Sequence, residues 1–376
     1  MVATQSMILF RNMDKSDKAD EPTTTTTTSS TSSKFSFIPH DVIRSHILPH
    51  LDGCTLASIS STTPELRTLI SSDQKLWSHL CHSTWPSTNT PRIRHLISTF
   101  PGGPRTFYSL SYPTLPPTLP LNLRPPSPSH QLISAVDLFY RGKCIFSKVQ
   151  ENETVTGWFR CSPFRIDLLD PKESVPTPIR RPSHDDTCRE LYSELELSWV
   201  LVCPTRRLSL NVSSLKPVNV DKHWLSGEVH VRYAVVVDNV VFVVDVTCVG
   251  CGPGGLVLHV TEVCLKMEDL DGVGLIGKDS LVILQRVFEG KRGNGKLVGV
   301  EQGKKRYLEY LDRRKEWKEN QLKREGRLDG MCVVFGVGFI VSLFCWSLIL
   351  ALLLKVMSLF LFRTHQMRTR NRFVPS

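Results

Sequence analysis

Apolar residues recur every three or four positions between residues 35 and 85, a spacing that predicts short amphipathic helices. The first helix is expected to start at Pro39, because proline suits the first helical turn, and to end at Asp52-Gly53. Pro49 should shorten it. Its apolar positions are Val42, Ile43, Ile47 and Leu51.

Three further helical segments are expected in the same region. Thr55 can cap a second helix, Pro64 starts a third, and Asp73 precedes a final turn. Their apolar positions are Leu56, Ile59, Leu66, Leu69, Ile70, Leu76, Trp77 and Leu80. Because a module of about fifty residues buries only a small core, we expect it to complete its burial against another protein.

A β-rich pattern begins near residue 129. The clearest element is a hairpin over Gly227–Cys248, in which apolar residues alternate with polar ones and Asp238-Asn239 turns the chain. Further strands are predicted at 143–149, 154–161, 194–202 and 256–267, with a turn at Glu151-Asn152. We expect helices at 132–139 and 279–289 and a polar loop at 170–187. A further short helix should start at Pro91 and be followed by a turn at Gly102-Gly103-Pro104.

Residues 331–354 contain no charged side chain, and fifteen of them are Leu, Ile, Val or Phe. As a helix they would be about 36 Å long, enough to cross a hydrocarbon core of about 30 Å. A charged helix over 304–328 precedes them. The alternative, an apolar helix that docks onto a partner of a soluble protein, stays open.

The net charge of +10 is concentrated near the C-terminus. Residues 301–330 hold ten Lys or Arg and seven Asp or Glu, and residues 331–376 hold five Lys or Arg and no acid. The basic excess therefore flanks the apolar segment and does not indicate nucleic-acid binding. Seven Lys or Arg in 311–330 and four after 362 place the N-terminal part in the cytosol by the positive-inside rule. We expect a tail anchor in the endoplasmic reticulum or another cytosol-facing membrane.

The segment 35–85 resembles an F-box. The resemblance rests on Ile38-Pro39-x-Asp41, His46-Ile47-Leu48-x-x-Leu51, Thr55-Leu56-Ala57-x-Ile59, Leu66-Arg67-x-Leu69-Ile70 and Leu76-Trp77. The later runs Leu80-Cys81-x-Ser83-Thr84-Trp85-Pro86-Ser87 and Arg92-x-Arg94-His95-Leu96-Ile97-Ser98-Thr99-Phe100-Pro101 are similar to one group of plant F-box proteins. Pro49 and Pro64-Glu65 depart from the usual pattern.

The resemblance implies a non-catalytic substrate receptor of a cullin-based ubiquitin ligase. Its partners would be a Skp-type adaptor and, through it, a cullin and a RING protein, together with an unknown substrate. The implied adaptor contacts are Ile38, Pro39, Asp41, Ile43, Ile47, Leu48, Leu51, Leu56, Leu66, Ile70, Leu76 and Trp77. On the exposed sheet face, Glu228, His230 and Arg232 are plausible substrate contacts, although a solvated strand face explains them equally well.

The predicted fold class is α+β: an N-terminal three-helix F-box-type module, an antiparallel β-rich domain with flanking helices, and a C-terminal transmembrane helix. The expected segments are a disordered Ser/Thr-rich tail (1–34), the helical module (35–85), a helical extension and Pro-rich linker (86–128), a β-rich substrate domain (129–299), a charged juxtamembrane helix (300–330), the membrane anchor (331–362) and a basic tail (363–376).

Little in the sequence indicates catalysis. Cys248 and Cys251 form a lone CxxC without the second pair that a structural zinc site needs, so no metal or other cofactor is expected. The eleven cysteines are scattered, which indicates a reducing compartment. The alternative to a ligase subunit is a membrane-tethered scaffold or ligand-binding β-domain protein whose helices are only structural.

Overall fold

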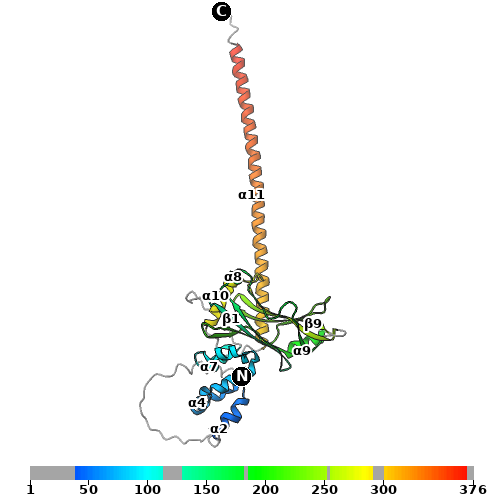
Figure 1. Ribbon diagram of the computed structural model, residues 1–376. Helices are drawn as coiled ribbons and strands as arrows, with labels where there is room; N and C mark the ends of the chain where they lie inside the picture. Colours follow the sequence, from blue (N-terminus) through cyan, green and yellow to red (C-terminus); the bar gives the residue numbers. More distant parts are fainter. Residues whose placement is uncertain (1–38, 113–128, 182–184, 252–254, 291–299, 371–376) are drawn as a thin grey trace, which may run out of the picture. The chain divides into compact units, whose positions relative to one another are not determined.

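The computed structural model describes residues 39–112, 129–181, 185–251, 255–290 and 300–370. It divides into two compact units, with the boundary between Arg314 and Lys315. The predicted α+β class is confirmed: helices come first, antiparallel sheets follow, and a long helix ends the chain (Figure 1). The predictions for residues 1–34, for Ile38, for the linker 113–128 and for the last six residues lie outside the described residues.

The helical part of the first unit comprises α2 (His40–Val42), a π turn η3 (Ile43–Ile47), a 3₁₀ turn η4 (Leu48–His50), α3 (Gly53–Ser60), α4 (Pro64–Ser72), α5 (Gln74–Thr84), η5 (Pro86–Asn89), α6 (Pro91–Ser98) and α7 (Gly103–Ser111). The first predicted helix is thus short and irregular. Pro49 accounts for this, because it lacks an N–H and its ring clashes with the carbonyl four residues earlier.

Side-chain caps fix the starts of α3, α4 and α5. Asp52 accepts the N–H of Thr55 at 2.7 Å, so Asp52 and not Thr55 caps α3, and that prediction was wrong. Pro64 is confirmed at the first position of α4, after the cap Thr63. Asp73 caps a helix of eleven residues, α5, where only a turn was expected. Gly102, with φ +84°, is the N-cap residue just before α7, a helix that the sequence did not reveal.

The β-rich part forms two antiparallel sheets. The four-stranded sheet has the order β2-β1-β5-β6, with β1 (Gln131–Tyr140), β2 (Lys143–Glu153), β5 (Leu195–Cys203) and β6 (Leu208–Asn211). The six-stranded sheet has the order β3-β10-β9-β8-β7, and β4 also pairs with β10. Its strands are β3 (Arg165–Asp167), β4 (Val175–Arg180), β7 (Asn219–Lys222), β8 (Val229–Val237), β9 (Val240–Cys251) and β10 (Val257–Glu268).

Several predictions in this part are confirmed. The hairpin β8–β9 turns at Asp238, whose φ of 53° is the left-handed conformation that such a turn needs. The strands β5 and β10 and the helices α6 and α10 (Gly277–Glu289) also lie where the sequence placed them. The buried residues Leu284 and Val287 of α10 belong to the core that includes both sheets.

Other predictions were wrong. The expected helix at 132–139 is strand β1, which is buried on both faces and therefore lacks a polar alternation. The turn at Glu151-Asn152 lies inside β2, and the chain turns instead at Arg141-Gly142, both with positive φ. The expected strand 154–161 contains a helix, α8 (Gly157–Cys161), because the Thr156 side chain caps it. The expected loop 170–187 holds β4 and the start of α9 (Asp185–Glu194).

The first unit is layered. One core fills the space between the two sheets and includes Trp199 of β5 and Tyr233 of β8. A second core lies on the other face of the four-stranded sheet, where Ile133, Ala135, Val200 and Val202 pack against the N-terminal helices. The helical module and the β-rich part therefore have one hydrophobic core in common.

The last helix, α11 (Val300–Arg370), contains both the predicted charged helix and the predicted apolar segment. In the first unit its early turns bury Tyr307 and Tyr310 against Ala234, Val241 and Val243 on the outer face of the six-stranded sheet. The Tyr310 hydroxyl donates to the Asp269 carbonyl oxygen at 2.5 Å. By length and composition, α11 includes a stretch that could cross a membrane.

Candidate functional site

Six of the twelve expected adaptor contacts are buried in the helical module itself: Ile43, Leu48, Leu56, Ile70, Leu76 and Trp77, each at most 6% exposed. The indole of Trp77 is completely buried and its N–H donates to the Ile70 carbonyl oxygen at 2.8 Å. These side chains hold the module together, and they offer almost no surface to a partner in this conformation.

The remaining described contacts are at the surface. Pro39 and Asp41 are exposed, Ile47 is 37% exposed, and Leu51 and Leu66 are half-buried. Val42, which was not among the expected contacts, is 40% exposed. In a π turn, hydrogen bonds join residues five apart, so Val42 and Ile47 lie on nearly the same face. We call Pro39, Asp41, Val42 and Ile47 the helix-one surface.

An ion pair fixes the helix-one surface to α5. The guanidinium of Arg44 binds Asp73, which also accepts the N–H of Leu76 at 3.0 Å as the α5 cap. Burial alone would raise the pKa of Asp73, but the hydrogen bonds from Arg44 and Leu76 outweigh it, and the pKa is lowered. One carboxylate thus joins two helices that are far apart in the sequence.

A second buried carboxylate joins the helical part to the four-stranded sheet. Asp137 of β1 is 1% exposed and accepts the Ser87 N–H at 2.8 Å, the Ser87 hydroxyl at 2.6 Å and the Ser147 hydroxyl at 2.7 Å. Burial raises the pKa of Asp137, although these hydrogen bonds act in the opposite direction. Ser87 belongs to a run quoted for the family resemblance, but nothing in the local sequence pointed to Asp137.

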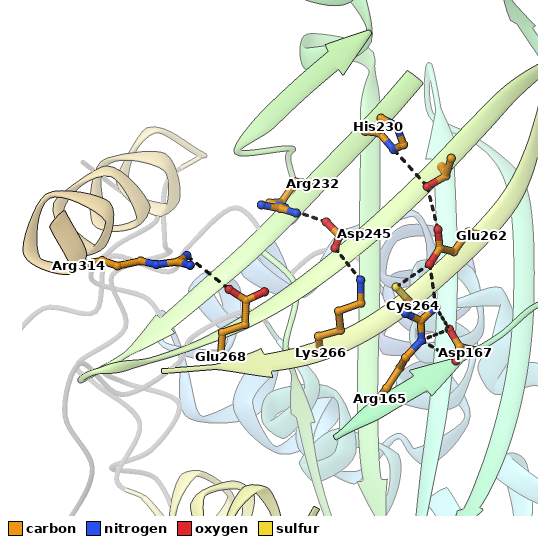
Figure 2. A network of polar contacts seen from close by, with 11 residues as sticks. Arg165, Asp167, His230, Arg232, Asp245, Glu262, Cys264, Lys266, Glu268 and Arg314 are labelled. Carbon is orange, nitrogen blue, oxygen red and sulfur yellow. Dashed lines mark hydrogen bonds and ion pairs between the residues drawn. The ribbon is translucent and has the colours of Figure 1, made fainter. Parts of the chain in front are cut away.

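The outer face of the six-stranded sheet carries two groups of charged side chains beside the area covered by α11 (Figure 2). In the first group, Arg165 pairs with Asp167 at 2.7 Å and with Glu262 at 2.8 Å, and Glu262 accepts the Thr247 hydroxyl at 3.1 Å. The nearby His230 ring nitrogen lies 3.3 Å from the same hydroxyl.

In the second group, Asp245 lies between Arg232 at 2.7 Å and Lys266 at 3.3 Å. Arg314 of α11 pairs with Glu268 at 3.5 Å. His230 and Arg232 therefore lie on the outer face, as the sequence suggested, and Glu228 lies 3.8 Å from the His230 ring. The sequence analysis did not identify Arg165, Asp245 or Glu262. For the two acids, the local signal was a carboxylate at an outward-facing position of a strand rich in β-branched residues.

Three side chains of the first group, Asp167, Glu262 and Cys264, are close enough together to be considered as metal ligands. Arg165 already neutralises both carboxylates. Burial raises the pKa of the Cys264 thiol to about 12, so a metal bound here would have to displace the thiol proton as well as the Arg165 ion pairs. The donor set fits an ion-pair cluster better than a metal centre.

The CxxC cysteines lie on β9. Cys248 is buried in the core between the sheets, where burial raises its pKa to about 12, and Cys251 is half-buried at the end of the strand. Residues three apart on a strand point to opposite faces. The two thiols are therefore not arranged as a pair of ligands on one face.

Comparison with known proteins identifies the family. Three F-box proteins of Arabidopsis thaliana are similar to this chain: a probable F-box protein (44% identity, 82% of this chain and 93% of the relative), a second (41%, 84% and 96%) and a third (42%, 76% and 82%). No family model and no solved structure matches. At this identity and coverage, the chain belongs to the plant F-box proteins.

Proposed function

We propose that this chain is a non-catalytic substrate receptor of a Skp–cullin–F-box ubiquitin ligase and acts at a membrane surface. Its membership of the F-box family is the observation that carries the proposal. The exposed helix-one surface at the start of a small, well-packed helical module is what such a receptor needs for docking.

The helix-one surface would bind the Skp-type adaptor. Pro39, Val42 and Ile47 supply apolar area, and Asp41 supplies a charge at the rim. The six buried members of the expected set act indirectly, because they position these exposed side chains. Binding of the adaptor would bring in the cullin and the RING protein.

The β-rich part would hold the substrate. The buried contact between Asp137 and Ser87 fixes it to the helical module, so that a bound substrate keeps a defined position relative to the adaptor. Ligation then depends on proximity: the assembly raises the effective concentration of substrate lysines near the ubiquitin-charged enzyme.

The apolar part of α11 would anchor the ligase to a cytosol-facing membrane. Residues 331–354 carry no charge, and the α11 stretch that could span a membrane includes them. Seven Lys or Arg in 311–330 favour the cytosolic side for the F-box module.

The direct test is co-purification of a Skp-type adaptor with the full chain in detergent. A Val42→Ser/Ile47→Ser variant should recover at least about tenfold less adaptor. The matched control, Val155→Ser/Val273→Ser, removes two exposed valines outside the helical module and should bind normally. Adaptor recovered equally with all three proteins would reject the helix-one surface. Adaptor recovered with none would reject the ligase role and favour a membrane-tethered β-domain protein.

A further inference from the structure

Two loops at one end of the six-stranded sheet present large apolar side chains to solvent. Trp224 and Leu225, in the turn between β7 and β8, are 86% and 74% exposed. Leu256, just before β10, is 68% exposed, and Val257 follows it at 39%. Exposed Trp and Leu side chains gathered in one place indicate an interaction site. We call Trp224, Leu225, Leu256 and Val257 the apolar end patch.

The β7–β8 turn is held by its own polar groups. The His223 N–H donates to the Glu228 carbonyl oxygen at 2.7 Å, and the Gly227 N–H donates to the His223 carbonyl oxygen at 2.8 Å. The Ser226 N–H donates to the His223 ring nitrogen at 3.1 Å. Since these bonds fix the turn without Trp224 or Leu225, both side chains are displayed on a preorganised loop, which lowers the entropic cost of binding.

Arg181 joins the two loops into one surface. The backbone N–H of Arg181 donates to the Leu256 carbonyl oxygen at 2.7 Å, and its guanidinium donates to the Ser226 carbonyl oxygen at 3.4 Å. Glycine permits this close approach at position 227, which has φ +68° and where a Cβ would collide with the guanidinium. Arg181 thus holds the backbones of two loops that are distant in the sequence close together at one end of the sheet.

Arg180 and Arg181 place two guanidinium groups at the rim of the apolar end patch, on the side of β4. Arg180 is exposed and is the register partner of Val257, so the two side chains share a face of the sheet. The nearby acids have other contacts: Asp221 accepts a hydrogen bond from the Asn219 amide, and Glu228 lies 3.8 Å from the His230 ring, but both keep their charge. On the side of β4, the two guanidinium groups complement a partner that carries acidic residues beside its apolar ones.

Within the first unit, the apolar end patch and the contact of Arg313 with the β8–β9 turn lie at opposite ends of β8. Arg313 of α11 contacts the Asp238-Asn239 turn, at the opposite end of β8 from Trp224. The nine residues of β8 separate these two ends by about 30 Å. Arg313, one residue before the end of the first unit, therefore lies far from the apolar end patch.

We propose that the apolar end patch binds an apolar segment, flanked by Asp or Glu, of the protein substrate. This proposal rests on the proposed receptor function and assigns its substrate surface. Trp224 would be the central anchor, Leu225 and Leu256 would complete the apolar contact, and Arg180 and Arg181 would face the acidic flank.

The test uses the full chain in detergent and random 16-residue peptides displayed on phage, after depletion on a Trp224→Ser/Leu225→Ser variant. Enriched peptides should combine Leu, Ile or Phe with Asp or Glu. Fluorescein-labelled copies should bind the variant at least about tenfold more weakly than the wild type. Trp158→Ser is the matched control, because Trp158 is 83% exposed in α8, and it should bind normally.

Three results would overturn the proposal. The first is that no peptide distinguishes wild type from variant. The second is peptide binding only after residues 1–33 are deleted, which would assign the patch to the short apolar sequence Met7-Ile8-Leu9-Phe10 of the same chain. The third is Trp224-dependent binding of phosphatidylcholine–phosphatidylserine vesicles without peptide binding. Adaptor co-purification is measured on the same variants. Its retention in Trp224→Ser/Leu225→Ser separates failure of this proposal from failure of the receptor function.

Discussion

Ser87 gives both its backbone N–H and its hydroxyl to the buried carboxylate of Asp137, fifty residues later in the chain. This pair joins the 3₁₀ turn after α5 to the first strand of the four-stranded sheet. It explains how a helical module and a β-rich part with separate sequence patterns form one compact unit.

Replacement of Asp137 should therefore destabilise the whole unit. Asp137→Ala leaves the two buried donors of Ser87 without an acceptor, and it also removes the contact with the exposed Ser147 hydroxyl, so it should lower the free energy of unfolding by about 3 kcal/mol. Asp137→Asn keeps one acceptor oxygen and should cost less. Urea unfolding of the full chain in detergent, followed by tryptophan fluorescence, measures both. Equal losses for Ala and Asn would show that the hydrogen bonds are not the cause.

Asp73 should make the free energy of unfolding depend on pH in the acidic range. Its folded pKa is lowered, so its contribution is complete above the unfolded pKa of about 4 and is lost as the pH falls through the folded value. The difference in unfolding free energy between wild type and Asp73→Asn should shrink below about pH 4. A constant difference down to pH 2 would contradict this.

The contribution of Asp137 to the free energy of unfolding should change with pH in the opposite direction to that of Asp73. Because its folded pKa is raised, protonation favours the folded state, and stability is gained as the pH falls through the raised value towards about 4. The wild type should therefore gain on Asp137→Asn over this interval. The same urea titrations, repeated at several pH values, test both carboxylates.

The buried and exposed members of the expected adaptor set should behave differently. Trp77→Ala empties a completely buried site and should cost about 3–5 kcal/mol of stability, with adaptor binding lost through misfolding. Ile47→Ser should change stability by less than about 0.5 kcal/mol and still weaken adaptor binding. A comparison of unfolding free energy with adaptor recovery for each variant distinguishes a core residue from a contact residue.

Tyr233→Phe should not destabilise the protein. The Tyr233 hydroxyl is buried between the sheets without a hydrogen-bond partner among the described residues. Removal of an unsatisfied buried hydroxyl avoids its desolvation cost, and the gain should be about 1 kcal/mol. A loss of more than about 1 kcal/mol in urea unfolding would indicate a partner for this hydroxyl.

The apolar part of α11 should decide membrane association. The full chain should stay in the membrane pellet during alkaline carbonate extraction, whereas a variant without residues 331–362 should be released. Release of the full chain under these conditions would favour a helix that docks onto a protein partner.

Local patterns predicted those elements whose two faces differ. The β8–β9 hairpin has one face in the core and one outside, so its sequence alternates, and Asp238 marks its turn. Strand β1 is buried on both faces and gave no alternation, so it was mistaken for a helix. The short helix α8 depended on a single cap, Thr156, inside a segment with strand-like composition.

The sequence by itself determined the helical module and its family resemblance, the main hairpin and the long apolar segment, because each depends on periodicity or composition within a short stretch. Tertiary structure alone decided which apolar residues of the first helix are buried, which strands lie side by side, and which distant groups meet, as Arg165 does with Glu262 and Arg181 with Leu256. The physical reason is that burial and ion pairing depend on contacts between segments far apart in the chain, which local spacing does not encode.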